Sequence, residues 1–132
     1  MKYTTSFLVF PRHCNHHKDL IFGGAFMAEL DLAAANCVRK ALVEGGSLLE
    51  NAVTHKANFE FKKPAYVGDL LDLEAKVVSV GTKSIEIEVT ATRKNNLIAV
   101  ANFVFITVGE IRSLEHHPNF LPYENHGISF VH

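Results

Sequence analysis

The chain has 132 residues and a formal net charge of -1 at pH 7, and 48% of its residues are hydrophobic. A near-neutral chain with this balance offers no basic surface for nucleic acid or for an anionic membrane. No apolar run reaches the length of a transmembrane helix. These features predict one globular domain over residues 1–132, with enough chain to bury a sizeable core.

The cysteines predict the cellular compartment. The two in the chain, Cys14 and Cys37, lack the spacing of a disulfide framework, so we expect free thiols in a reducing environment. The first residues, MKYTTSFLVFPRH, lack the long apolar core and the small-residue cleavage site of a signal peptide. Together these features predict a cytoplasmic protein.

The first half of the chain predicts one strand and one long helix. β-branched and aromatic residues predict a strand over residues 5–10, which a proline ends. Residues 12–20 are polar and rich in histidine, and they predict a loop. After two glycines a helical period runs from about residue 23 to residue 43, where a Glu-Gly-Gly sequence ends it.

The second half alternates with the period of two that is typical of strands. Apolar residues at every second position predict strands over about 56–62, 71–77 and 85–92. Turn sequences at residues 81–83 and 94–96 predict hairpins on either side of the third of these strands. The pattern therefore predicts a meander of antiparallel strands.

Residues 97–108 are apolar almost throughout, which is typical of a strand covered on both faces. Residues 110–132 show no period and are predicted to form an irregular tail. One strand, one long helix and four meandering strands predict an α+β fold in which a curved antiparallel sheet wraps around the helix.

One carboxylate does not fit the predicted helix. At helical spacing Asp31 falls within an apolar stripe. The other members of this stripe are Met27, Ala34, Ala35, Val38 and Leu42. Because an unpaired buried carboxylate is costly, Asp31 either pairs with a basic neighbour such as Arg39 or Lys40, or it has a functional role.

Four short motifs occur in a fixed order along the chain. They are P-x-x-x-N from Pro11, F-G-G-x-x-M-x-x-x-D from Phe22, F-x-x-P-x-x-V-G-D from Phe61 and V-x-x-V-G-x-x-S-I from Val77. In this order they resemble the hotdog-fold acyl-CoA thioesterases over roughly residues 9–108. The resemblance implies a single hotdog domain that hydrolyses an acyl-CoA thioester to a free acid and CoA. It also implies at least a homodimer with shared active sites, or a trimer of dimers, and no metal or cofactor beyond the CoA of the substrate.

The same resemblance assigns catalytic residues. Asp31 is expected to attack the thioester or to activate a water molecule, and the amides at the start of the helix, around Gly24, are suited to bind the developing oxyanion. Asn15 matches an asparagine that similar proteins contribute across a dimer interface. The loop after Asn15 is one residue longer than in the family pattern and lacks the expected glycine. His16 or His17 is therefore the alternative partner of Asp31.

Residues that bind the substrate and its CoA group are assigned at three places. They are Phe22 and Gly23 before the helix, Gly81, Lys83 and Ser84 in a turn, and Arg93 at a strand end. In similar proteins this turn lies near the CoA nucleotide, so the resemblance implies that Lys83 and Arg93 contact its phosphates. A solvated hairpin tip is the simpler interpretation of each.

Other interpretations stay open from the sequence alone. The spacing of His13, His16 and His17 could suggest a metal site, but no cysteine or carboxylate repeats with it, and solvated histidines are the simpler reading. A hydratase or dehydratase acting on acyl thioesters would use a histidine and aspartate pair. A non-catalytic acyl-CoA sensor would keep a pocket without acid-base groups. A purely structural domain would leave Asp31 unexplained.

Overall fold

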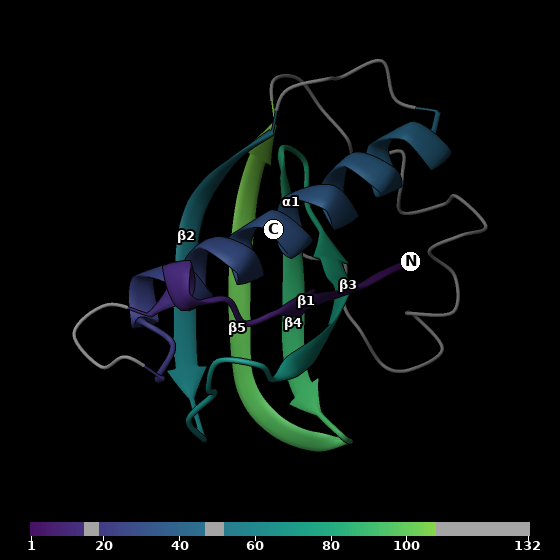
Figure 1. Cartoon of the computed structure of the whole chain (residues 1–132). Helices are drawn as coiled ribbons and strands as arrows, with labels where there is room; N and C mark the ends of the chain where they lie inside the picture. The colour runs from purple at the N-terminus through teal and green to yellow at the C-terminus, as the bar shows by residue number, and fades with distance from the viewer. Residues whose placement is uncertain (15–18, 47–51, 108–132) are drawn as a thin grey trace.

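The computed structural model describes residues 1–14, 19–46 and 52–107. In chain order the elements are β1 (Lys2–Leu8), the 3-10 helix η1 (Pro11–His13), α1 (Gly23–Glu44), β2 (Ala52–Phe61), β3 (Leu70–Val80), β4 (Ser84–Arg93) and β5 (Asn96–Thr107). The strands form one antiparallel sheet in the order β1-β3-β4-β5-β2, which curves around α1 (Figure 1). This confirms the predicted α+β hotdog architecture. The predicted meander of four strands is only partly correct, because β2 pairs with β5 at the edge of the sheet rather than with β3. Neither helix within these residues combines the length and the apolar character needed to span a membrane.

The core lies between α1 and the inner face of the sheet. The inward residues of β4 are Ile85, Ile87, Val89 and Ala91, and all four are fully buried. The stripe that α1 buries consists of Phe26, Leu30, Ala33, Ala34, Cys37, Val38, Ala41 and Leu42. Full burial of a large aliphatic or aromatic side chain stabilises the fold by about 1.5–3 kcal/mol, so this single core can hold α1 against the sheet.

Strand boundaries correct part of the sequence prediction. The first strand begins at Lys2 and ends at Leu8, rather than spanning residues 5–10, because β1 pairs with β3 in a register that runs from Lys2 opposite Lys76 to Leu8 opposite Leu70. β2 starts at Ala52, four residues earlier than predicted, and its register shifts between Thr54 and Lys56. These limits are set by pairing with distant strands, which local sequence does not report.

The prediction that the last strand is covered on both faces is wrong for this chain. Residues of β5 alternate between buried and partly exposed positions, and the outward Ile106 is 36% exposed. The cause is that α1 covers only one face of the sheet. The residues after 107, including the predicted tail over 110–132, lie outside the described residues.

The predicted loop over residues 12–20 is only partly a loop. Its first residues belong to η1, and His13, expected in solvent, is only 5% exposed. The His13 Nδ1 atom accepts a hydrogen bond from the Phe10 amide at 2.9 Å, and Nε2 lies 3.5 Å from Glu29 Oε1. A backbone bridge pairs Cys14 with Ile21. His13 is therefore part of the packing that joins η1 to α1.

The two predicted turns are both present. Residues 81–83 connect β3 to β4, and Lys94 and Asn95 connect β4 to β5 with positive φ angles of 51° and 70°. Positive φ at both central residues is the conformation of the tight hairpin turn that matches the twist of the strands. The second turn ends one residue earlier than predicted, because Asn96 already belongs to β5.

Candidate active site

Asp31 lies at the margin of the buried stripe of α1, on the side that faces β2. Its side chain is half-buried, in contrast to the fully buried Leu30 and Ala34 beside it. This corrects the predicted position of Asp31 within the apolar stripe. The stripe that α1 buries includes Leu30 and Cys37, which lie roughly 100–120° around the helix from Asp31 at 100° per residue. A carboxylate at this margin avoids the cost of full burial and remains accessible to a ligand.

Thr54 is the partner of Asp31. The Thr54 hydroxyl, from β2, donates a hydrogen bond of 2.9 Å to Asp31 Oδ1. This is a different partner from the basic residues Arg39 and Lys40, which the sequence suggested. Hydrogen bonds to a charged group are stronger than those between neutral groups, so Thr54 fixes the orientation of the carboxylate and leaves Oδ2 available.

The start of α1 offers hydrogen-bond donors. Its N-cap residue, Phe22, has an extended conformation and makes no side-chain hydrogen bond to the helix. The first intrahelical bond runs from the Phe26 amide to the Phe22 carbonyl, so the amides of residues 23–25 have no partner within the described residues. The first turn also contains no acidic residue. Free amides and the positive end of the helix dipole favour an anionic or polarised oxygen here.

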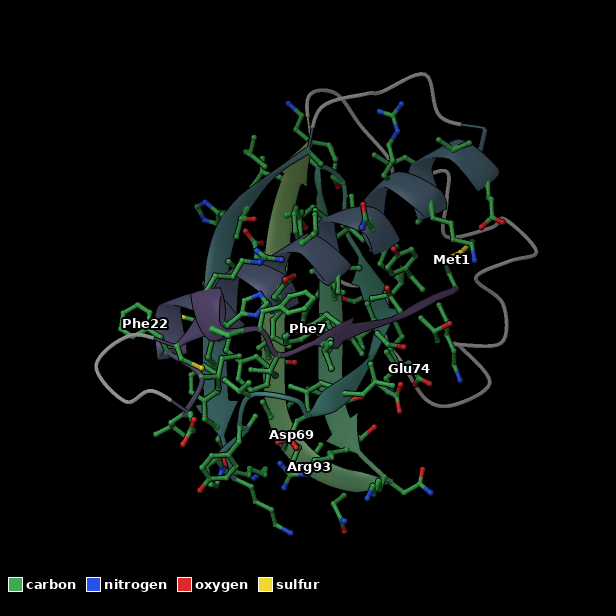
Figure 2. The ribbon with its side chains drawn as sticks, viewed as in Figure 1. Met1, Phe7, Phe22, Asp69, Glu74 and Arg93 are labelled. Carbon is green, nitrogen blue, oxygen red and sulfur yellow. The ribbon has the colours of Figure 1, made fainter. Side chains whose placement is uncertain are left out.

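Gly23 and Gly24 differ in their surroundings. A Cβ atom added to Gly23 would have no atom within 4 Å, whereas one added to Gly24 would lie 2.8 Å from the Phe22 ring. Phe22 itself is half exposed beside the helix start (Figure 2). The backbone of Gly23 is consequently open to close approach by a ligand.

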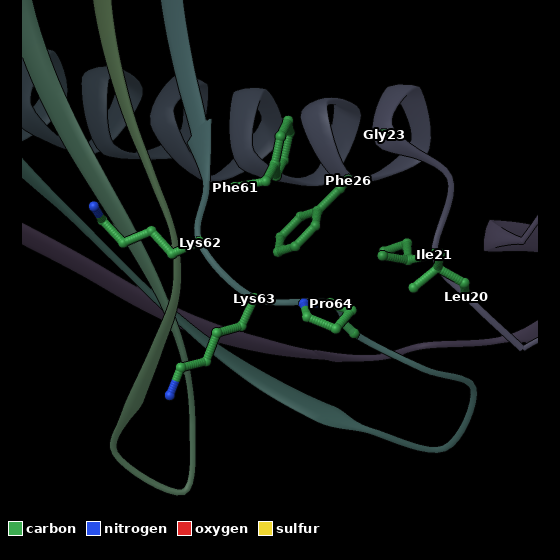
Figure 3. Close-up of a pocket in the computed structure, with 9 residues that line it drawn as sticks. Leu20, Ile21, Gly23, Phe26, Phe61, Lys62, Lys63 and Pro64 are labelled. Carbon is green, nitrogen blue, oxygen red and sulfur yellow. The ribbon is translucent and has the colours of Figure 1, made fainter.

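A pocket of about 330 Å³ lies beside the start of α1. It is lined by Leu20, Ile21, Gly23, Phe26, Phe61, Lys62, Lys63, Pro64 and Ala65 (Figure 3). Phe26 reaches it from α1 and Phe61 from the end of β2, with ring centroids 5.3 Å apart. The pocket and Asp31 therefore lie along the same side of α1, the side that faces β2.

The residues predicted to bind CoA are divided between the two ends of β4. Gly81, Lys83 and Ser84 lie at its beginning and Arg93 at its end. Nine residue steps along a strand span about 30 Å, so the turn and Arg93 are not brought together within one chain. The pocket lies at the Arg93 end, because the Arg93 guanidinium donates to the Pro64 carbonyl at 3.2 Å.

Arg93 also makes an ion pair. Its Nη1 atom lies 2.7 Å from Asp69 Oδ2, the same oxygen that accepts a hydrogen bond from the Tyr66 amide (Figure 2). These contacts tie the end of β4 to the segment before β3. They favour a structural role for Arg93, whereas the described residues give Lys83 no ion pair or side-chain hydrogen bond.

The remaining candidates are the residues of the loop before α1, the buried thiol of α1 and a possible metal site. Asn15, His16 and His17 lie outside the described residues. Burial raises the pKa of the Cys37 thiol to about 12, and Cys37 is fully enclosed in the core, which is unsuitable for a nucleophile. Within residues 1–14, 19–46 and 52–107, no cluster of three His, Cys, Asp or Glu side chains could hold a metal ion.

The model of one protein family matches the chain. It is described as the thioesterase superfamily, and it matches residues 19–100, more than half of the sequence. The matched stretch includes Asp31, Thr54 and all of the residues that line the pocket. No curated protein matches the sequence significantly.

Solved structures share the fold. One is smu.793 from Streptococcus mutans UA159 bound to acetyl CoA, 20% identical, with a TM-score of 0.68 over 83% of this chain and 82% of that one. The E. coli PaaI protein from the phenylacetic acid degradation operon is 19% identical, with a TM-score of 0.69 over 83% and 74%. A variant of 4-hydroxybenzoyl CoA thioesterase complexed with 4-hydroxybenzoyl CoA is 18% identical, with a TM-score of 0.68 over 80% and 83%. At these identities the likeness establishes the fold.

Proposed function

The chain belongs to the thioesterase superfamily, and we propose that it hydrolyses acyl-CoA thioesters to a free acid and CoA. In this proposal the Asp31 carboxylate is the general base or the nucleophile. Two structures of the same fold were solved with acyl-CoA ligands, acetyl CoA and 4-hydroxybenzoyl CoA. The proposal rests chiefly on one observation, the half-buried carboxylate that Thr54 holds on the open side of α1.

A positioned carboxylate suits this reaction. A thioester is already activated, and its leaving group is a thiolate, so no serine triad is required. The Thr54 hydroxyl donates its hydrogen bond to Asp31 Oδ1. The other oxygen can take a proton from an attacking water molecule or attack the carbonyl carbon directly. In either case the hydroxyl of Thr54 keeps the carboxylate in one orientation during the reaction.

The amides at the start of α1 supply the second requirement, a site for the oxyanion. As the carbonyl carbon becomes tetrahedral its oxygen gains negative charge, and donors held about 2.9 Å from that oxygen stabilise the transition state. The uncapped amides at Gly23 and Gly24 are fixed by the helix and need no rearrangement. The open space beside Gly23 admits the carbonyl group.

The start of α1 and Asp31 could also meet across an interface between two subunits. Gly24 and Asp31 lie on the same face of α1, seven residues apart, which corresponds to about 10 Å between their Cα atoms. Two copies of α1 packed antiparallel about a two-fold axis would bring Gly24 near Asp31 of the partner subunit. We therefore propose a homodimer, alone or within a trimer of dimers.

The exposed residues around Asp31 favour the same arrangement. β2 pairs only with β5 among the described strands, and its Val53 is 64% exposed. Met27, one turn before Asp31 on α1, is 38% exposed. An unpaired strand edge next to exposed apolar side chains is a surface that a second subunit would cover.

The same two-fold axis would bring opposite ends of two sheets together. The turn that carries Gly81, Lys83 and Ser84 in one subunit would then approach the pocket end of its partner, where Phe22 and Gly23 lie. We propose that this turn contacts the CoA nucleotide. From the resemblance, Asn15 is proposed to orient the attacking water or the carbonyl, with His16 as the alternative.

The test is the release of free CoA thiol from a panel of acyl-CoAs by wild type and by Asp31→Asn. The variant keeps the side-chain shape and can still accept the Thr54 hydrogen bond, but it loses basicity, so we expect kcat to fall about 10³-fold. Glu29→Gln is the matched control, because it removes a carboxylate from the same helix on the side of β1, and it should retain activity within about threefold. Equal turnover by Asp31→Asn would contradict the mechanism, and saturable acyl-CoA binding without turnover would indicate a sensor.

A further inference from the structure

The pocket beside the start of α1 has almost no polar lining. Its side chains are aliphatic or aromatic except for Lys62 and Lys63. The Lys62 ammonium group is paired with Glu60 Oε1 at 2.7 Å. In Figure 3 both lysine side chains extend away from the space between Phe26 and Ile21. The interior is therefore apolar, and the charged groups lie at its rim.

The backbone around the pocket is also occupied. The Ile21 amide donates to the Ala65 carbonyl at 2.9 Å, and the amides of Lys62 and Lys63 both donate to the Ile98 carbonyl, at 2.8 and 3.2 Å. Among the described residues, the amides at the start of α1 and those of Leu20 and Ala65 have no hydrogen-bond partner. No side chain inside the pocket could replace the hydrogen bonds to water that a polar ligand group would lose there.

These features distinguish the two arms of an acyl-CoA thioester. The pantetheine arm contains amides, which need both donors and acceptors, and no side chain inside this pocket supplies them. An apolar acyl arm needs none, and each buried methylene group favours binding by about fourfold. The volume of about 330 Å³ is at the small end of ligand pockets.

We propose that this pocket holds the acyl group, and that the substrates are acyl-CoAs whose acyl chain is uncharged, apolar and of short to medium length. The assignment rests on the proposed thioesterase function and names its substrate class. The carbonyl would lie at the Gly23 end of the pocket. Phe61 forms a wall of the pocket and, at 41% exposed, can be truncated without opening the core. Phe61 is therefore the residue that limits chain length.

The test compares acyl-CoAs that differ in the length of the acyl chain or in the group at its far end. We expect kcat/KM for hexanoyl-CoA to exceed that for acetyl-CoA at least tenfold, because four more methylene groups are buried. It should exceed that for adipoyl-CoA, which has the same length and a terminal carboxylate, at least 100-fold. An adipoyl-CoA value within tenfold of hexanoyl-CoA would overturn the proposal and would indicate that Lys63 binds a carboxylate.

Variants of the wall test the position of the chain. Phe61→Ala should raise the ratio of dodecanoyl-CoA turnover to hexanoyl-CoA turnover at least tenfold. Leu20→Phe should lower the ratio of octanoyl-CoA turnover to butyryl-CoA turnover. Tyr66→Ala is the matched control, because Tyr66 is a neighbouring exposed aromatic residue that does not line the pocket, and its ratios should stay within twofold of wild type. Unchanged ratios in both wall variants would overturn the assignment.

A binding measurement separates this inference from the proposed function. The Kd values of hexanoyl-CoA and adipoyl-CoA are measured by calorimetry on the Asp31→Asn variant. Suppose that the wild-type protein releases no CoA from any substrate, while the variant binds hexanoyl-CoA at least tenfold more tightly than adipoyl-CoA. This result would contradict the proposed hydrolase and support the acyl pocket. Active hydrolysis with equal Kd values would support the hydrolase and overturn the acyl pocket.

Discussion

The two edges of the sheet differ in how α1 covers them. At the β1 edge exposed and half-buried residues alternate, and two hydrogen bonds tie the strand to α1, from Asn36 Nδ2 to the Tyr3 hydroxyl at 3.2 Å and from Lys40 Nζ to the Lys2 carbonyl at 3.1 Å. At the β2 edge eight of ten residues are exposed, and the side-chain hydrogen bond to α1 is that between Thr54 and Asp31. The β2 side is thus the more open of the two.

The proposed active site lies on the more open of these two sides. Asp31, Thr54 and the apolar pocket all belong to the open side, together with exposed apolar residues such as Val53. Changes at β2 should therefore affect assembly and activity, and equivalent changes at β1 should not.

The largest effect is expected from a charge on the β2 edge. Val53→Glu would place an unpaired carboxylate in the proposed subunit interface, so we expect a monomer and a loss of activity of at least 100-fold. Light scattering coupled to size exclusion, followed by the thiol-release assay, measures both. Thr4→Glu, at an exposed position of β1, should remain dimeric and active. An active Val53→Glu dimer would refute the role of this edge.

A smaller effect is expected at the start of α1. Gly23→Ala has open space for its Cβ atom, so stability should be unchanged or rise by up to about 1 kcal/mol. The added methyl group would still obstruct the thioester, and we expect kcat/KM to fall about 30-fold.

Gly46→Ala, just after α1, is the control for this change. Gly46 has a φ of +74°, so the free energy of unfolding should fall by about 1 kcal/mol while activity is retained. Thermal unfolding and kinetics of both variants provide the comparison. A destabilised but fully active Gly23→Ala protein would show that substrate does not approach this glycine.

The smallest effect is expected at Thr54. Thr54→Val keeps the side-chain shape and removes the hydroxyl that donates to Asp31, so kcat should fall about tenfold with little change in KM. Thr54→Ser should restore most of the rate. Thr5→Val makes the same change at a half-buried position of β1, and a comparable loss of rate there would indicate a general effect on packing.

Much of the fold was readable from the sequence. The alternation in β4 predicted its buried face, and the glycines at residues 45–46 predicted the end of α1. The limits of β1 and β2 were not readable, because they depend on partners such as Lys76 and Thr107 that lie far along the chain. Local propensity reports which residues can form a strand, and pairing decides where the strand begins.

The site was predictable only in part. The sequence singles out Asp31 as a candidate because a carboxylate beside apolar residues departs from the helical pattern. Thr54 was missed because it lies 23 residues away on a strand whose start was not predicted. The burial of His13, which the sequence predicts to be solvated, could not be predicted because burial of a single polar residue depends on tertiary packing. The separation of Lys83 from Arg93 could have been found, since both flank one predicted strand of known rise.

The measurement that tests the central claim most directly uses heterodimers of two inactive variants, Asp31→Asn and Gly23→Val, purified through two different affinity tags. If each site takes Asp31 from one subunit and the helix start from the other, one of the two sites in the heterodimer is intact. The account predicts about half the CoA-release activity of the wild-type dimer, with both homodimers near background. Heterodimer activity that stays at the background of the homodimers would contradict a site shared between subunits.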